Sequence, residues 1–263
     1  MSVEPAAVKA CCASAYAGDA ARWLLGERFH PGGAALTQRL IDALRVGPGQ
    51  LVVDIASGPG TSTLQVARET GCDVIGVDLS AASVEAARQA AERSGLADRA
   101  RFLEGDAESL PLHDAVADGV ISECALCTFP DKHAAAAEIA RVLKPGMRLA
   151  LSDMVAEPGR LPAELHTLAA WVSCIADARP LDEVEALLGV VGLKCEHSER
   201  CDDALADLLD RVEARLRAAR VLGRVAPEVL VENVERGLAM VGSARTAVAD
   251  GALGYGVVVA RRT

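Results

Sequence analysis

The middle of the chain alternates short apolar runs with amphipathic stretches. The apolar runs have the length of buried strands and lie at residues 51–55, 73–78, 100–104, 118–122 and 147–153. The amphipathic stretches between them predict helices at residues 62–70, 80–94 and 132–143. Ser80 is placed to cap the second helix, and Pro145 and Gly146 end the third. Strands that alternate with helices predict a doubly wound, Rossmann-like α/β fold with a mostly parallel sheet.

Beyond residue 153 the spacing of apolar residues changes and helices dominate. We expect helices at residues 161–175, 181–191, 204–221 and 227–248. Strands are expected at residues 193–199 and 254–261. The chain therefore divides into a helical N-terminal arm (1–40), a Rossmann-like domain (41–160), and a helical cap and C-terminal elaboration that ends in a sheet strand (161–263).

Composition and charge narrow the class of partner. Hydrophobic residues make up 51% of the 263, enough for a sizeable core, whereas aromatic residues make up 3% and the net charge is −10. This balance argues against a nucleic-acid or anionic-membrane surface. Apolar runs stay well below the ~18 residues of a membrane span, and Lys9, Asp19 and Arg22 interrupt the first 25 residues. We therefore expect a cytoplasmic protein that acts on a small molecule, without nucleic-acid or membrane partners.

A glycine-rich turn follows the first predicted strand. Gly58 and Gly60 let the backbone approach a ligand closely, because no Cβ stands in the way. Thr63 occupies the position of the last glycine in the dinucleotide pattern GxGxxG, which argues against NAD. Asp78 ends the second strand, where a carboxylate can accept hydrogen bonds from ribose hydroxyls, and Asp106 follows the third, where it could accept from an adenine amino group. The alternative for both acids is a helix cap.

Together these segments resemble the class I S-adenosylmethionine-dependent methyltransferase family. The matching stretches are VVDIASGPGT (52–61), VIGVDLS (74–80), FLEGDAESLPL (102–112), DGVISECALC (118–127) and RVLKPGMRLALSD (141–153). The resemblance implies that the turn holds the amino-acid end of S-adenosylmethionine and that the two acids bind ribose and adenine. Ala56 departs from the family, in which many members carry glycine. The residues expected to contact the cofactor are Asp54, Ala56, Ser57, Gly58, Gly60, Asp78, Leu79, Asp106, Ala107 and Glu123.

The chain contains eight cysteines, which is a large number for a protein expected in the cytoplasm. A disulfide framework is not expected in a reducing compartment, and the single CxxC pair, Cys124 and Cys127, does not make a zinc finger. Buried cysteines usually act as small hydrophobic residues, and we expect that role for Cys72, Cys195 and Cys201. The remaining five are candidates for chemistry.

The positions of these five cysteines resemble those of arsenite methyltransferases. In that family one cysteine follows the fourth strand, a second lies in the cap, and a third precedes the glycine turn. Cys124, Cys174 and either Cys11 or Cys12 fit those positions. The resemblance implies that thiolates hold trivalent arsenic while its lone pair attacks the methyl group, with glutathione or another thiol filling a missing place. Cys12, Cys124 and Cys174 are expected to be catalytic; the candidate arsenic ligands are Cys11, Cys12, Cys124, Cys127 and Cys174.

Two other functions remain open at this point. The chain departs from the arsenite methyltransferases at Leu126 and Cys127, where that family usually carries asparagine. A small-molecule O-, N-, C- or S-methyltransferase of metabolism or natural-product biosynthesis would use the cysteines only to line an apolar pocket. A non-catalytic protein that binds the cofactor or senses a metalloid is the third possibility.

Overall fold

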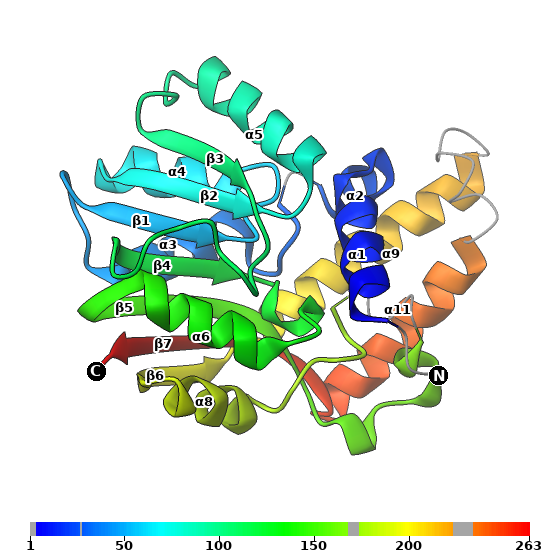
Figure 1. Ribbon diagram of the computed structural model, residues 1–263. Helices are drawn as coiled ribbons and strands as arrows, with labels where there is room; N and C mark the ends of the chain where they lie inside the picture. Colours follow the sequence, from blue (N-terminus) through cyan, green and yellow to red (C-terminus); the bar gives the residue numbers. More distant parts are fainter. Residues whose placement is uncertain (1–3, 27, 168–173, 223–233) are drawn as a thin grey trace.

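One seven-stranded sheet organises the molecule, in the order β3-β2-β1-β4-β5-β7-β6 (Figure 1). The computed structural model describes residues 4–26, 28–167, 174–222 and 234–263. The strands are β1 (Leu51–Ile55), β2 (Asp73–Asp78), β3 (Ala100–Glu104), β4 (Ala117–Glu123), β5 (Leu143–Ala156), β6 (Leu193–Arg200) and β7 (Leu253–Arg262). The predicted Rossmann-like, mostly parallel sheet is therefore confirmed.

Strand β1 lies in the parallel part of the sheet, between β2 and β4. Val53 is in register with Ile75 of β2 and Val120 of β4, and β5 continues the parallel order. Strand β7 runs antiparallel to both β5 and β6 and lies between them. Strand β5 is longer than the run predicted at 147–153. Pairing with β7 explains its extension to Ala156, and pairing of Leu143 with Ala117 of β4 explains its earlier start.

Helices cover both faces of the sheet. The face that includes Val52 packs against α3 (Gly33–Leu44), α4 (Thr61–Thr70) and α5 (Ala81–Arg93). The opposite face, which includes Val53, packs against α6 (Lys132–Val142) and α8 (Leu181–Val190). Neighbouring residues of a strand point to opposite faces, so the two cores alternate along β1. Ser80 caps α5 as predicted, because its Oγ accepts a hydrogen bond of 3.2 Å from Ser83 N.

The segment predicted as a helix at 161–175 is not an α-helix where the structure describes it. It holds a short 3₁₀ turn, η3 (Ala163–His166), preceded by η2 (Pro158–Arg160). Pro162 accounts only for the extended backbone of Leu161, because proline disfavours helical backbone at the residue before it. Residues 168–173 of the prediction lie outside the described residues.

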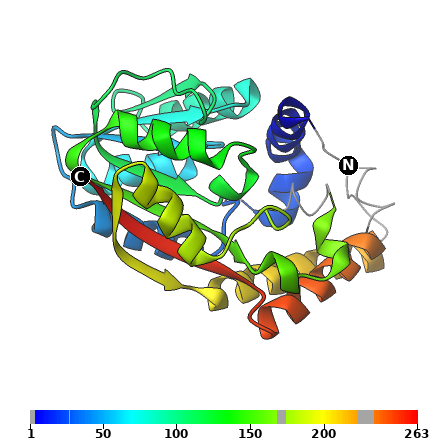
Figure 2. The ribbon, with the colours of Figure 1, turned by 60° about the horizontal axis from the view of Figure 1, so that its bottom comes forward.

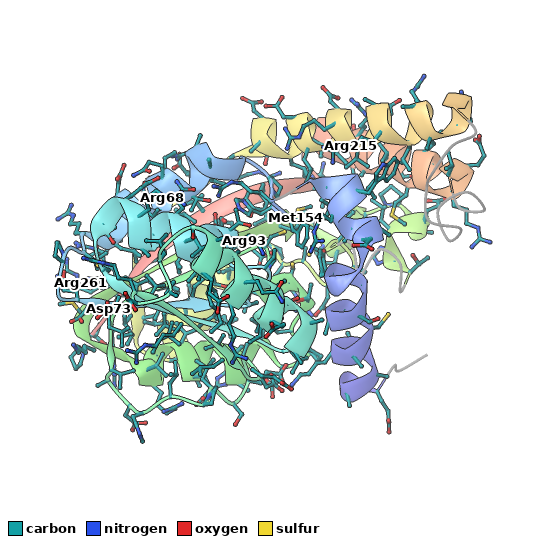
Figure 3. The ribbon with its side chains drawn as sticks, turned by 90° about the horizontal axis from the view of Figure 1, so that it is seen from above. Arg68, Asp73, Arg93, Met154, Arg215 and Arg261 are labelled. Atoms are coloured by element: carbon teal, nitrogen blue, oxygen red, sulfur yellow. The ribbon has the colours of Figure 1, made fainter. Side chains whose placement is uncertain are left out.

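The remaining helices form a second group beside the sheet. They are α1 (Pro5–Ala17), α2 (Asp19–Leu25), α9 (Asp202–Leu222) and α11 (Val234–Ala249). Helix α9 packs against both α11 and α2 (Figure 2). Arg215 of α9 donates hydrogen bonds to Trp23 O (3.0 Å) and Leu24 O (2.8 Å) at the end of α2 (Figure 3). The C-terminal helices thereby anchor α2.

The helix predicted at 227–248 is observed from residue 234 onward, and its first residues, 227–233, lie outside the described residues. Strands β6 and β7 lie beyond residue 160 but belong to the same sheet as β1. The division of the chain at residue 160 therefore stays a prediction. None of the helices within the described ranges combines the length and the apolar character needed to cross a membrane.

Gly76 provides a test of how tightly the sheet packs beneath the glycine turn. A Cβ atom there would lie 2.6 Å from the ring of Phe102 and 2.7 Å from Ser57 Oγ. We expect Gly76→Ala to lower the free energy of unfolding by about 1–3 kcal/mol, measured by urea denaturation, because this core has no spare volume. Gly159→Ala is the control, since no heavy atom lies within 4 Å of its Cβ position, and it should change stability by less than ~0.5 kcal/mol. Equal stability of the two variants would contradict the packing described.

Candidate functional site

A cavity of about 160 Å³ opens at the carboxyl ends of β1, β2 and β4. In doubly wound sheets ligands bind at this edge, near the point where the strand order reverses. All ten predicted cofactor residues surround this cavity or its glycine turn. Nine of them line it directly: Asp54, Ala56, Ser57, Gly58, Asp78, Leu79, Asp106, Ala107 and Glu123.

Gly60, the tenth, lies in the glycine turn and does not line the cavity. Its φ is 81°, and a Cβ atom would lie 2.8 Å from the Phe102 ring, so only glycine fits. Gly58 has no heavy atom within 4 Å of its Cβ position, which leaves the backbone open to a ligand. Ala56 adopts a φ of 58° in the left-handed region. That conformation explains why relatives carry glycine there, and alanine adopts it at a cost in strain.

Asp54 is fixed inside the protein by Thr63. The carboxylate is 3% exposed and accepts a hydrogen bond of 2.6 Å from Thr63 Oγ1. Burial raises the pKa of Asp54 to about 8, against the lowering effect of Thr63 and with the charges of Glu123 and Asp78 adding to the rise. Thr63, the residue that breaks the dinucleotide pattern, thus holds a carboxyl group at the cavity.

Asp78 and Asp106 are both held by neighbouring donors. Asp78 accepts from Gly58 N (2.7 Å) and Ser80 N (2.9 Å). Asp106 accepts from the amide of Glu108 (2.9 Å) and from Lys9 Nζ of α1 (2.6 Å). The helix-cap alternative therefore does not account for Asp106, whose partner comes from the far side of the cavity. Lys9 was not identified from the sequence.

Glu123 lies in a small polar network that the sequence did not predict. Both of its carboxylate oxygens accept from Thr37 Oγ1 at 3.1 Å, and one also accepts from Ser62 Oγ at 2.5 Å. His30 Nε2 lies 3.6 Å from the same oxygen. His30 and Thr37 precede or belong to α3, far from β4 in sequence, and no motif pointed to them.

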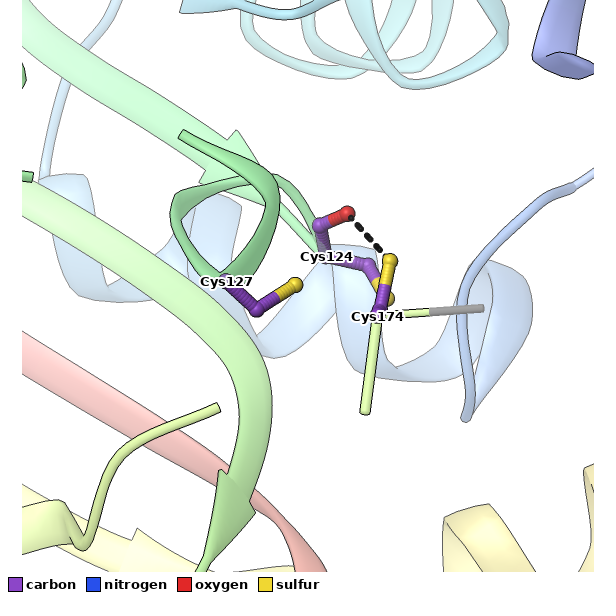
Figure 4. A group of neighbouring side chains, drawn as sticks. All are labelled: Cys124, Cys127 and Cys174. Carbon is purple, nitrogen blue, oxygen red and sulfur yellow. Dashed lines mark hydrogen bonds between the residues drawn. The ribbon is translucent and has the colours of Figure 1, made fainter. Parts of the chain in front are cut away.

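Three cysteines lie close together just beyond the end of β4 (Figure 4), and one of them, Cys124, lines the cavity. The Sγ atoms of Cys124, Cys127 and Cys174 all lie within 4.8 Å of one another. Cys124 follows β4, Cys127 lies in η1 (Leu126–Thr128), and Cys174 precedes α8. Cys124 and Cys174 have φ values of 55° and 63°, which non-glycine residues rarely adopt. Strained backbone of this kind persists where the surrounding structure imposes it, often at functional sites.

Cys11 and Cys12 lie outside this three-sulfur group. Cys12 lines the cavity from α1, and burial, reinforced by Cys174, raises the pKa of its thiol to about 11. Cys11 is the next residue on the helix, about 100° around its axis, so it does not share that face. Cys72 is buried away from the site, where its Sγ donates to Gly47 O (2.9 Å). The third close sulfur is therefore that of Cys127.

The three thiols are not equivalent. Hydrogen bonds from Cys124 and Cys127 lower the pKa of the Cys174 thiol, and Tyr16 Oη, 3.1 Å from its Sγ, adds to this against the effect of burial. Burial and the same hydrogen bonds raise the pKa of Cys127. At Cys124 the contact with Cys127 lowers the pKa, but the contact with Cys174 and burial outweigh it and raise the pKa. The pKa of Cys174 is therefore the lowest of the three.

Polar groups behind the sulfur atoms fix their loops. Cys127 N donates to Asp153 Oδ2 (2.9 Å), and Lys132 Nζ donates to Cys127 O (3.3 Å) and to Asp177. A second cavity, of about 250 Å³, lies on this side and includes Cys127, whereas Cys124 lines the first. The three-sulfur group thus forms part of the wall between two cavities.

The first cavity suits a ligand that offers both polar and apolar groups. The backbone of Gly58 is open to a ligand there, and backbone amides fix the carboxylate of Asp78 at the cavity. These groups match a ligand with ribose hydroxyls and an amino-acid end.

Comparisons with known proteins agree with this geometry. The family model described as "Methyltransferase domain" matches residues 47–189. The 27-O-demethylrifamycin SV methyltransferase of Amycolatopsis mediterranei is 34% identical over 166 residues, which cover 62% of this chain and 61% of that protein. The arsenite methyltransferase of Halobacterium salinarum is 32% identical over 154 residues, which cover 57% of this chain and 38% of that protein. The chain therefore spans less than two thirds of either relative.

A solved structure shares the fold. The phosphoethanolamine N-methyltransferase 2 of Haemonchus contortus, in complex with S-adenosyl-L-methionine, superposes with a TM-score of 0.79 at 20% identity. The match covers 95% of this chain and 57% of that chain. At this identity the likeness concerns the fold alone.

The buried carboxyl of Asp54 predicts a pH dependence of stability. Its pKa in the folded chain, about 8, lies above its ordinary value of 3.8, so the folded form binds the proton more tightly. The resulting stabilisation is complete below about pH 4 and is lost as the pH rises towards 8. Asp54→Asn removes this loss. We expect the variant to gain at least ~2 kcal/mol relative to the wild type between pH 5 and pH 8 in urea unfolding without ligand. A difference independent of pH would show that Asp54 is already ionised at pH 5.

Proposed function

We propose that this chain, which belongs to the family of S-adenosylmethionine-dependent methyltransferases, transfers the methyl group to trivalent arsenic. The observation that carries the proposal is the group of three sulfur atoms at the wall of the cofactor cavity. Thiolates are soft ligands that select soft, thiophilic ions. Arsenite in the form As(OH)₃ can exchange its three hydroxyl groups for three thiols with release of three water molecules, which leaves its lone pair free.

The residues of the cavity divide into two parts with different tasks. Asp78 and Asp106 would hold the nucleoside of the cofactor, and the glycine turn, with Asp54, Ser57 and Glu123, would surround its amino-acid end. When bound, S-adenosylmethionine supplies a methyl carbon made electrophilic by its sulfonium, so the protein has only to align a nucleophile and exclude water. Cys124, Cys127 and Cys174 perform that alignment in this proposal. The complete set of three protein thiols makes glutathione unnecessary as a ligand, although a thiol can still deliver arsenic.

The runner-up is methylation of a natural product, which the similarity to the 27-O-demethylrifamycin SV methyltransferase of Amycolatopsis mediterranei supports. In that case the cysteines only contribute apolar surface to the acceptor end of the cavity. The two functions differ in whether the sulfur atoms themselves are required.

Replacing the sulfur atoms one at a time tests the proposal. We expect Cys124→Ser and Cys174→Ser each to lower methyl transfer to arsenite at least ~100-fold, because loss of one of three soft ligands removes the substrate site. Transfer is measured with S-adenosylmethionine labelled in its methyl group, in the presence of glutathione. Binding of S-adenosylhomocysteine, measured by calorimetry, should change less than about threefold.

Cys201→Ser is the matched control, since Cys201 is half-buried and lies outside the three-sulfur group. It should methylate arsenite at the wild-type rate. If Cys124→Ser and Cys174→Ser also keep that rate, the arsenic proposal is wrong and the natural-product alternative gains. If the wild type transfers no methyl group to any acceptor, a non-catalytic binding role remains.

The identity of the third ligand is tested separately. The geometry favours Cys127, whereas the resemblance to arsenite methyltransferases favours Cys11 or Cys12. We expect Cys127→Ser to weaken arsenite binding by at least ~30-fold and Cys12→Ser by less than about threefold, measured as protection of the remaining thiols or by calorimetry. The opposite ranking would assign the third position to Cys12 and would require α1 to move closer to Cys174 than in this structure.

A further inference from the structure

Helix α1 presents one face to the whole length of the cavity. Lys9, Cys12, Ala13 and Tyr16 all line it, and their spacing of three, four and seven residues places them on one side of a helix. The two ends of this face touch different parts of the site. Lys9 reaches the turn after β3, and Tyr16 reaches Cys174.

The Lys9 end is held by charge. Lys9 Nζ donates to Asp106 Oδ2 at 2.6 Å and also pairs with Glu108. The side chains of Lys9 and Glu108 are 20% and 13% exposed, so this pairing is partly shielded from water. Glu108 also accepts from Asp131 N (2.8 Å), which connects the contact to the start of α6. The pairing therefore joins α1 to the rigid part of the sheet.

The Tyr16 end covers the sulfur group. Its Oη lies 3.1 Å from Cys174 Sγ, and its ring lies 6.0 Å from that of Phe29. Cys174 is only 2% exposed. Access to the three-sulfur group from the first cavity therefore depends on where α1 lies.

Apart from these two ends, α1 has few attachments. Among its residues with described side chains, only Val8 and Cys12 are buried, and the N-cap residue Glu4 makes no side-chain capping hydrogen bond. Helix α2, by contrast, is held by Arg215 of α9. A helix with so little buried surface is readily displaced unless polar contacts hold it.

We infer that Lys9 is a positioning residue, which keeps α1 across the cavity and thereby controls the sulfur group at the other end. Its side chain acts on the cysteines only through the helix, because its own partners lie at the nucleotide end. This inference rests on the proposed function, and it deepens that function by linking the cofactor and acceptor halves of the site. A ligand that binds while α1 lies across the cavity stabilises that position of the helix. A second ligand that needs the same position of α1 then binds more tightly.

The test measures how fast iodoacetamide alkylates Cys174, with the modified peptide quantified by mass spectrometry. We expect Lys9→Met to speed alkylation of Cys174 about tenfold in the ligand-free protein, because α1 leaves the site more often. Saturating S-adenosylhomocysteine should slow it again in the variant, because we expect a ligand that fills the cavity to contact the residues of α1 that line it. Cys72 is the internal standard: it is buried away from α1, and its unchanged rate would show that the fold is intact.

Two further variants separate positioning from general destabilisation. Lys9→Arg keeps the charge and should restore the wild-type rate at Cys174. Arg22→Met removes a basic residue of α2 whose exposed partner, Asp19, lies outside the cavity, and should also leave the rate unchanged. Equal alkylation of Cys174 in Lys9→Met and the wild type would overturn the inference, as would an equal acceleration by Arg22→Met.

Arsenite enters only in a separate arm of the experiment. Protection of Cys174 by arsenite in the wild type tests the proposed function, and its absence would contradict that function without changing the Lys9 result. If arsenite protects, we expect Lys9→Met to weaken its apparent affinity about tenfold without cofactor and within about twofold of the wild type with saturating S-adenosylhomocysteine. If Lys9→Met weakened arsenite binding equally with and without S-adenosylhomocysteine, Lys9 would not act through the position of α1. That result would overturn the inference.

Discussion

The site is built around three carboxyl groups that the sheet brings to one edge. Asp54, Asp78 and Glu123 end neighbouring parallel strands or lie one residue before the end, so they converge out of bulk water. Burial disfavours the charged form of a carboxyl group, which raises the pKa of Asp54 to about 8, and each buried carboxyl oxygen needs hydrogen-bond donors. The surrounding elements supply them: Thr63 serves Asp54, two turn amides serve Asp78, and Thr37 and Ser62 serve Glu123. Placing these donors fixes α3, α4 and the glycine turn relative to the sheet.

Local patterns were sufficient to predict most of the fold, and the residues that they single out as cofactor contacts lie around one cavity or its glycine turn. Strands, turns and helix caps leave a signature within a few residues, and parallel strands bring their carboxyl ends together in any sheet of this class. The predicted helix at 161–175 is wrong where it can be compared, because residues 163–166 form a 3₁₀ turn that ends at the extended backbone of Thr167. The parts that sequence could not predict depend on contacts between distant segments. His30 and Thr37 meet Glu123 only once α3 has packed on the sheet.

The choice between Cys12 and Cys127 shows the same limit in the acceptor half. Both cysteines are candidate ligands in the sequence. The left-handed backbone at Cys124 turns the chain so that Cys127, in η1, lies close to Cys124. A backbone conformation that rare is not readable from residue types. The face of α1 that carries Lys9 and Tyr16, in contrast, has helical spacing and could have been recognised. This face lies outside residues 47–189, which the family model matches.

The position of β7 has a consequence for the order in which the chain can fold. This strand follows β6 in sequence but lies between β5 and β6, so β6 has no neighbour in the sheet until β7 has been synthesised. During synthesis the outer edge of β5 stays unpaired while the whole cap is made, and an open strand edge is a site for aggregation. The sheet is therefore completed only when residues far apart in the chain come into contact. Such a sheet is expected to fold more slowly than one in which consecutive strands are neighbours. Chaperones that shield strand edges would have their main effect on this interval.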